Sequence, residues 1–183
     1  MGIVLASGSP RRRELLEEAG VGFVVKVSPA EEIHDESMAP EKLCEANAEL
    51  KAAAVAAEFP DEIVIGADTL VFIGGRALGK PKSLAEAKEM LRGLSGKTHR
   101  VCSGVCMIFP GDRRELFHGL TEVDFRDFDD GVIDAYFSKV NPLDKAGAYG
   151  IQEHGEMLVA GIRGSFDNVM GLPVDLVLRR LGR

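Results

Sequence analysis

Cysteine and the aromatic residues are scarce in this chain, which has 183 residues, no tryptophan, two tyrosines and three cysteines. The cysteines, Cys44, Cys102 and Cys106, are an odd number without the spacing of a disulfide framework. A metal site built on them would need further ligands, and only His99 lies nearby. Because Cys102 and Cys106 are four residues apart in a β-like run, we expect both on one face of a strand, as buried thiols.

Long hydrophobic runs are also lacking. No apolar run approaches the ~20 residues that span a bilayer, and residues 1–6 are too short for the apolar core of a signal peptide. We therefore expect a cytoplasmic protein without a membrane partner.

An excess of positive charge is missing as well, since the formal net charge is −7. An acidic chain repels nucleic-acid polymers, so a local basic cluster favours a small anionic ligand over DNA or RNA.

Two common catalytic signatures are absent. The P-loop string Gly-x-x-x-x-Gly-Lys-Ser/Thr is not found: Gly96-Lys97-Thr98 matches its end, but position 91 is leucine. We interpret that segment as a turn. The four histidines fall in no metal-ligand spacing, and no Ser-His-Asp or Cys-His arrangement is indicated.

Alternating strand and helix patterns predict the fold. Strands are expected over residues 3–6, 23–27, 63–73, 97–109, 115–127 and 157–162, and helices over 9–19, 40–58, 83–93, 129–139 and 172–181. The long antiparallel hairpin among these elements favours an α/β fold with a mixed twisted sheet flanked by helices. The length and the short loops predict one domain, residues 1–183.

The stretch 5–16 is the most informative. A short apolar strand runs into a Ser/Gly turn, and Ser9 stands at a helix N-cap position. Three cations, Arg11, Arg12 and Arg13, occupy the first turn, where the helix dipole is already positive. Backbone N–H groups, the hydroxyls of Ser7 and Ser9 and the guanidinium groups would together bind a polyphosphate. A solvated basic turn is the alternative.

Asp68 is the candidate for the chemical step. It follows five apolar residues, 63–67, at the end of what is predicted to be a buried strand, where a carboxylate is costly unless paired or bound to a cation. The alternative is an aspartate that starts a turn. Thr69 beside it is either a polar ligand contact or a β-former.

Other charged residues could complete a site. Glu31 or Glu32 could add a second carboxylate for Mg²⁺, although acidic loop pairs are commonly plain surface. Lys51 lies in a predicted helix and would by default be exposed. Lys80 lies in a loop and is fixed by the proline that follows it.

The segment 144–152 combines small residues around Tyr149 with a terminal amide. Its glycines would let the backbone approach a ligand closely, and the Gln152 amide offers a donor and an acceptor to a planar edge such as a nucleobase. A tight structural loop is the alternative.

Taken together, these strings resemble the Maf family of nucleotide pyrophosphatases. The matching segments are 5–16, 66–71, 79–81, 94–99, 142–152, and 164–165 through 171–173, in the order of the family and over essentially the whole chain. The resemblance implies a fold like that of inosine-triphosphate pyrophosphatases. It also implies hydrolysis of a nucleoside triphosphate between the α and β phosphorus atoms, dependent on a divalent cation, Mg²⁺ or Mn²⁺.

The resemblance also implies roles for individual residues. Asp68 matches the proton acceptor. The positions that mark the branch preferring dTTP and UTP are Arg11, Thr69 and Gln152. Further active-site positions match at Glu32, Lys51 and Lys80.

The expected partner is thus a nucleoside triphosphate, dTTP or UTP or a modified pyrimidine nucleotide, in cleaning of the nucleotide pool. The sequence leaves open whether the protein forms a homodimer. The alternatives are the 7-methyl-GTP branch of the same family and a non-catalytic regulator of cell division.

Overall fold

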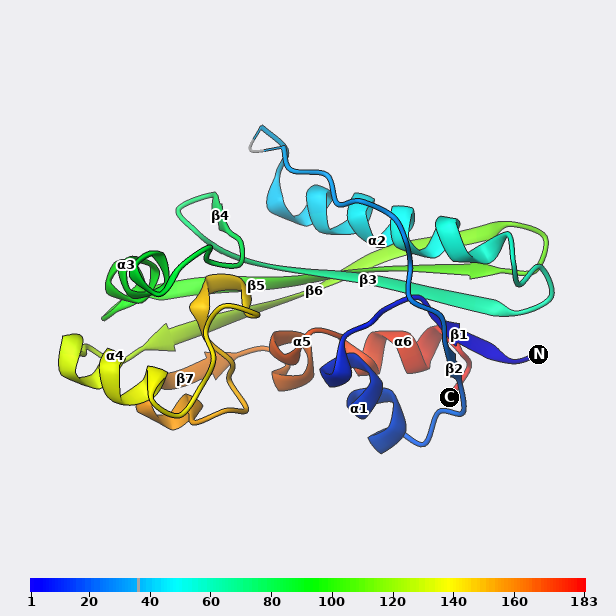
Figure 1. Cartoon of the computed structure of the whole chain (residues 1–183). Helices are drawn as coiled ribbons and strands as arrows, with labels where there is room; N and C mark the ends of the chain where they lie inside the picture. Colours follow the sequence, from blue (N-terminus) through cyan, green and yellow to red (C-terminus); the bar gives the residue numbers. More distant parts are fainter. Residues whose placement is uncertain (36) are drawn as a thin grey trace. The chain divides into compact units, whose positions relative to one another are not determined.

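The computed structural model describes residues 1–35 and 37–183, over which seven strands form one mixed sheet in the order β2-β1-β3-β5-β6-β7, with β4 paired to β3 (Figure 1). The strands are β1 Ile3–Leu5, β2 Val24–Val25, β3 Ile63–Ile73, β4 Arg76–Leu78, β5 Thr98–Phe109, β6 Arg113–Phe125 and β7 Val159–Arg163. The helices are α1 Pro10–Glu18, α2 Pro40–Ala56, α3 Leu84–Leu94, α4 Asp130–Phe137, α5 Phe166–Met170 and α6 Val174–Arg180. The predicted mixed α/β sheet is confirmed.

Some local predictions were wrong. β2 is only two residues long rather than five. A short helix, α5, lies where a loop was expected, because the Ser165 hydroxyl accepts the Asn168 N–H at 3.2 Å and supports its first turn. The segment between α4 and β7 also contains two 3₁₀ turns, Ala146–Ala148 and Gly155–Met157.

The chain divides into two compact units. The first consists of Met1–Thr69, Ser103–Gly119 and Gly171–Arg183, and the second of Leu70–Cys102 and Leu120–Met170. No helix in the described part of the chain has both the length and the apolar character needed to cross a membrane.

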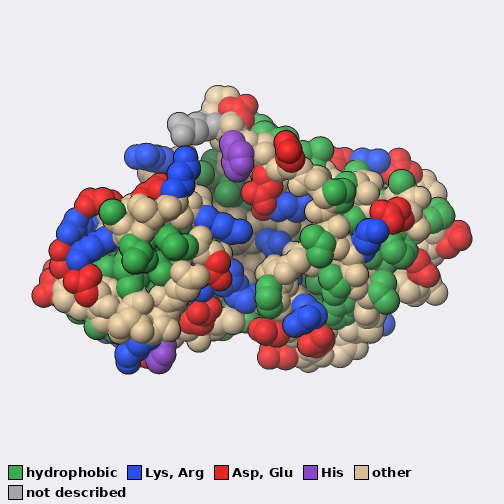
Figure 2. All heavy atoms as spheres, in the orientation of Figure 1, with side chains coloured by type: hydrophobic (Ala, Val, Ile, Leu, Met, Phe, Trp, Pro, Cys, Tyr) green, Lys and Arg blue, Asp and Glu red, His purple; other side chains and the backbone are tan. Residues whose placement is uncertain are grey.

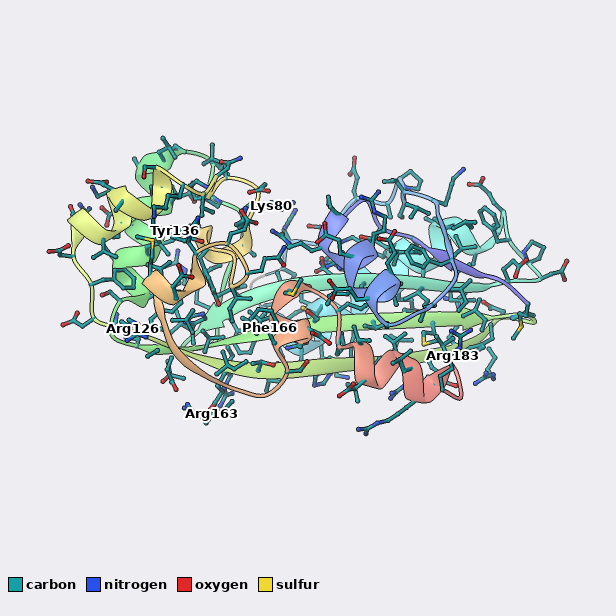
Figure 3. The ribbon with its side chains drawn as sticks, turned by 90° about the horizontal axis from the view of Figure 1, so that it is seen from below. Lys80, Arg126, Tyr136, Arg163, Phe166 and Arg183 are labelled. Carbon is teal, nitrogen blue, oxygen red and sulfur yellow. The ribbon has the colours of Figure 1, made fainter. Side chains whose placement is uncertain are left out.

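In the first unit, β1 runs parallel to both β2 and β3. Helix α2 covers one face of the strands, and α1 and α6 lie on the other (Figures 1 and 3). Small apolar side chains fill the space beneath α2: Val4, Ala6, Ala48, Ala52, Val55, Val64, Cys106 and Ile108. All three cysteines are buried, as expected for Cys102 and Cys106.

Two glycines let α2 touch the sheet backbone to backbone. A Cβ atom on Gly66 would lie 2.3 Å from the Ala48 carbonyl oxygen, and one on Gly104 would lie 2.4 Å from the Cys44 carbonyl carbon. No side chain fits at either place. Because alternate residues of a strand share a face, the contact at Gly66 also directs Asp68, two residues on, toward α2.

The second unit has its own core, in which α3 and α4 pack together. Next to this core lies His99, which is 1% exposed. Its ring meets Phe125 and Tyr149 edge-on, and its Nε2 lies 2.7 Å from the Tyr149 hydroxyl oxygen. Burial lowers the pKa of His99 to about 4, against the opposing effect of the Asp124 charge. The imidazole is therefore neutral near pH 7.

This neutral histidine predicts a loss of stability in acid. In the unfolded chain, His99 takes up a proton as the pH falls below its ordinary pKa of 6.5. In the folded chain it takes up that proton only when the pH falls to about 4. Stability contributed by this residue is therefore complete above pH 6.5 and is lost between 6.5 and 4, by up to ~3 kcal/mol. Urea unfolding at pH 7.0 and 4.5 should show a smaller difference for His99→Gln than for the wild-type chain. Equal differences would contradict the assignment.

Candidate active site

Asp68 is the sixth of the eleven residues of β3, so the strand predicted over residues 63–73 is confirmed, whereas the expectation that Asp68 stands at the end of a buried strand was wrong. The reason is that β3 is longer than its parallel neighbour β1. Strand β1 ends at Leu5, opposite Ile65, whereas β3 continues to Ile73. Asp68 thus lies past the end of β1, within a continuous strand. It is 5% exposed.

The Asp68 carboxylate is paired and hydrogen-bonded from α2. Lys51 Nζ donates to Asp68 Oδ1 at 2.8 Å and also to Glu32 Oε1 at 2.6 Å. One ammonium thus joins two of the predicted catalytic carboxylates. The Lys51 side chain is 13% exposed, so this helical lysine is not the solvated surface residue that its position alone would favour.

Asn47, one turn before Lys51, was missed by the sequence reasoning. Its side chain is buried, accepts the Ile33 N–H at 2.7 Å and donates to the Ile33 carbonyl at 3.2 Å. The same amide donates to Asp68 Oδ2 at 3.2 Å. Asn47 therefore ties the loop that carries Glu32 to α2 and fixes the orientation of Asp68. The i, i+4 spacing of Asn47 and Lys51 was the available signal.

On the opposite face, Thr69 belongs to a network around Arg12. The Arg12 guanidinium donates to the Ser7 hydroxyl and the Thr69 hydroxyl, both at 3.0 Å, and through Nε to the Gly171 carbonyl at 2.8 Å. The Thr69 and Ser103 hydroxyl oxygens lie 2.8 Å apart. Burial lowers the pKa of Arg12, and the negative charges of Asp68 and Glu32 oppose that shift.

The three arginines of α1 have different environments, and the polyphosphate site that they were expected to form stays a prediction. Successive helical residues point about 100° apart. Arg12 is buried, Arg11 is half-buried, and Arg13 is exposed beside Glu17, 3.8 Å away. Ser9 is at the N-cap as predicted, yet its side chain makes no capping hydrogen bond, and its N–H donates to Ser7 Oγ at 3.3 Å.

Ser103 and Gly171 are further site residues that the sequence reasoning missed. Both come from parts of the chain far from Arg12 in sequence, and the folded sheet brings them together. Gly171 has φ +128°, which side chains rarely adopt, and its carbonyl accepts from both Arg12 and Thr69. The glycine is therefore required for this carbonyl to face the network.

Lys80 and Gln152 belong to the second unit. Both are exposed, and Lys80 follows β4 (Figure 3). The glycines before Gln152 face protein atoms: a Cβ on Gly147 would lie 3.0 Å from Val71 Cγ1, and one on Gly150 would lie 2.8 Å from Lys145 Cε. Packing of Gly147 against β3 and of Gly150 against Lys145 explains these glycines without a ligand.

The donor chemistry around Lys51 fits a small hard cation. Asp68 and Glu32 offer carboxylate oxygens, and Mg²⁺ is commonly held by one or two carboxylates together with substrate phosphates and water. Within residues 1–35 and 37–183, His, Cys, Asp and Glu side chains form no group of three or more that could hold a metal. Asp68 and Glu32, both bound to the Lys51 ammonium in this structure, are the two predicted metal ligands, and that role stays a prediction.

On the face drawn in Figure 2, acidic and basic side chains are interspersed. This pattern accords with a net charge of −7.

The fold is shared with proteins of known structure. The structure is similar to the Staphylococcus aureus Ham1 protein, with a TM-score of 0.53 and 17% identity over 100% of this chain and 98% of that one. A HAM1 protein from Coxiella burnetii gives 0.56 and 18%, over 98% of this chain and 99% of that one. At these identities the likeness establishes the fold alone.

Sequence comparison identifies the family. A model of the family described as Maf-like protein matches residues 2–183, and the chain belongs to this family. It is 51% identical over 179 residues to the dTTP/UTP pyrophosphatase of Akkermansia muciniphila, covering 98% of this chain and 94% of that protein. It is 49% identical to the dTTP/UTP pyrophosphatase of a Bacillus cereus strain, over 98% and 88% of the two chains.

The Asn47 network predicts a stability effect. Asn47→Ala would leave the Ile33 peptide and Asp68 Oδ2 without these partners, so we expect a loss of about 2 kcal/mol in the free energy of unfolding. Glu49→Ala, on the same helix, removes a half-exposed ion pair with Arg114 and should cost ~0.5 kcal/mol. Urea denaturation of both variants measures the difference. Equal losses in the free energy of unfolding would show that the hydrogen bonds of Asn47 to Ile33 and Asp68 do not stabilise the fold.

Proposed function

We propose that this chain is a nucleoside triphosphate pyrophosphatase that hydrolyses dTTP and UTP to the monophosphate and pyrophosphate. The observation that carries the proposal is the buried Asp68 carboxylate, held by Lys51 and Asn47, in a chain about half identical to proteins named for this activity. Burying a carboxylate costs free energy that an apolar side chain at the same place would not, so a role in packing alone does not explain Asp68.

In the proposed reaction a water oxygen attacks the α phosphorus, and the bond from that phosphorus to the α–β bridging oxygen breaks. Pyrophosphate leaves with the bridging oxygen, and the proton of the attacking water passes to the Asp68 carboxylate. Asn47 and Lys51 orient Asp68 by hydrogen bonds to both of its oxygens.

The substrate carries about four negative charges, so positive charge and positioning supply most of the catalysis. Lys51, Lys80, Arg11 and the N-terminus of α1 would provide that charge, with Ser7 and Ser9 as hydroxyl donors. Arg12 already has three protein partners, so we assign it chiefly to holding Ser7 and Thr69 in place. A divalent cation held by Asp68 and Glu32 would neutralise phosphate charge and acidify the water.

Base choice is assigned to Gln152, with Arg11 and Thr69 as the other positions matching the dTTP/UTP branch. The Gln152 amide offers one donor and one acceptor, which match the O4 and N3–H edge of thymine or uracil. A mismatched base would leave the Gln152 donor or acceptor unpaired in the complex.

Three further parts of the proposal concern the whole protein. Residues 1–183 would act as one catalytic domain, which the family match over residues 2–183 supports. The protein would act in the cytoplasm, where its nucleotide substrates are made. The homodimer stays a prediction that light scattering can test.

The test is pyrophosphate release in the presence of Mg²⁺ from dTTP, UTP, CTP, GTP and 7-methyl-GTP. We expect kcat/KM to be highest for dTTP and UTP, lower for CTP and lowest for the purines. Asp68→Asn should lower kcat for dTTP by about 10²- to 10⁴-fold, since it removes the proton acceptor.

Asp61→Asn is the matched control, because Asp61 is exposed just before β3, and it should keep the wild-type rate. Absence of pyrophosphate release from every nucleotide would overturn the proposed function. A purine as best substrate would overturn the base preference alone. An Asp68→Asn variant with more than about a third of the wild-type rate would remove Asp68 from the chemistry.

A further inference from the structure

Lys145 is a buried lysine for which the proposed reaction has no use. It is 3% exposed, and its ammonium donates to the Asn141 carbonyl at 3.0 Å and to Asp144 Oδ1 at 2.9 Å. It also forms an ion pair with Glu153 Oε1 at 3.2 Å. A lysine so enclosed contacts its own loop rather than a ligand.

The stem of Lys145 runs directly beneath the turn that carries Gln152. A Cβ atom on Gly150 would lie 2.8 Å from Lys145 Cε, so Gly150 leaves room for that stem. The ion pair with Glu153 then reaches the residue after Gln152. Lys145 thus contacts the chain on both sides of Gln152.

Tyr136, from α4, holds the same turn at its first residue (Figure 3). The Gly150 N–H donates to the Tyr136 hydroxyl oxygen at 3.0 Å, and that hydroxyl lies 3.4 Å from the Gly150 carbonyl oxygen, to which it donates. Burial raises the pKa of Tyr136 to about 12, so the phenol keeps its proton near pH 7. The Gly150 carbonyl also accepts the Glu153 N–H at 3.2 Å, which closes the turn around Ile151 and Gln152.

We infer that Lys145 and Tyr136 are positioning residues for base selection, because they fix the turn 150–153 from which Gln152 projects. The inference rests on the proposed function and on Gln152 as the reader of the base. An amide can discriminate between thymine and cytosine only when it cannot rotate or shift to match either edge. A turn fixed at Gly150 and at Glu153 supplies that restraint at the backbone of Gln152.

The ratio of kcat/KM for dTTP to kcat/KM for CTP measures this restraint. Lys145→Met keeps the apolar stem and removes the ammonium, and Tyr136→Phe removes only the hydroxyl. Each should lower the ratio about 3- to 10-fold toward that of Gln152→Ala, because the loosened amide then accepts both edges. Lys139→Met, an exposed lysine just after α4, is the matched control and should keep the wild-type ratio.

The double variant Lys145→Met/Gln152→Ala separates positioning from general destabilisation. If Lys145 acts through Gln152, adding Lys145→Met to Gln152→Ala changes the ratio no further. Circular dichroism checks that each variant is folded, and Tyr136→Phe carries the test if Lys145→Met is not.

Three results would overturn the inference while leaving the pyrophosphatase assignment intact. They are an unchanged ratio in folded Lys145→Met and Tyr136→Phe, an additional loss in the double variant equal to the loss from Lys145→Met alone, and an unchanged ratio in Gln152→Ala. Failure of the proposed function is distinguished beforehand, since the wild-type chain would then release no pyrophosphate from dTTP.

Discussion

The direct backbone contact between α2 and the strands beneath it is the constraint on which the candidate site depends. Gly66 and Gly104 leave no atom between the helix and the sheet, so α2 approaches more closely than side chains would permit. Only at this distance do the short amide of Asn47 and the ammonium of Lys51 both reach Asp68. The small side chains of Ala48 and Ala52 serve the same close contact, because larger ones would push α2 away from the sheet.

This packing explains how a carboxylate is accommodated inside a core. Asp68 loses the hydration that water would give it, and Lys51 and Asn47 replace part of that hydration with fixed hydrogen bonds. Removing one partner of a buried pair commonly costs ~3–5 kcal/mol, so the pair is a constraint on the fold as well as on the chemistry. Across the sheet, Thr69 faces the Arg12 network, because neighbouring residues of a strand point to opposite faces.

Much of the fold and several site residues could be predicted from the sequence, and the exceptions have physical causes. The apolar run before Asp68 and the strand-to-helix passage at Ser9 are local signals. Such signals predicted the strands and helices and the unfavourable burial of the Asp68 carboxylate. Ser103 and Gly171 act through contacts between distant segments, which periodicity does not encode. For Asn47 the only local signal was its i, i+4 spacing to Lys51. The sequence also could not show that Arg12 would be buried while Arg13 is exposed beside Glu17, because helical rotation turns neighbouring residues to different sides. In the loop before Gln152, the sequence could not distinguish glycines that admit a ligand from glycines that admit Lys145.

A comparison of two strand glycines tests the central claim most directly. Gly66→Ala forces a methyl group into the α2 backbone, whereas Gly161→Ala, in β7, adds a methyl with no atom within 4 Å. We predict that Gly66→Ala lowers the free energy of unfolding by at least ~2 kcal/mol and, in the fraction that stays folded, abolishes pyrophosphate release from dTTP, because α2 is displaced from Asp68. Gly161→Ala should match the wild-type chain in both measurements. A Gly66→Ala protein with wild-type stability and wild-type turnover would contradict the account.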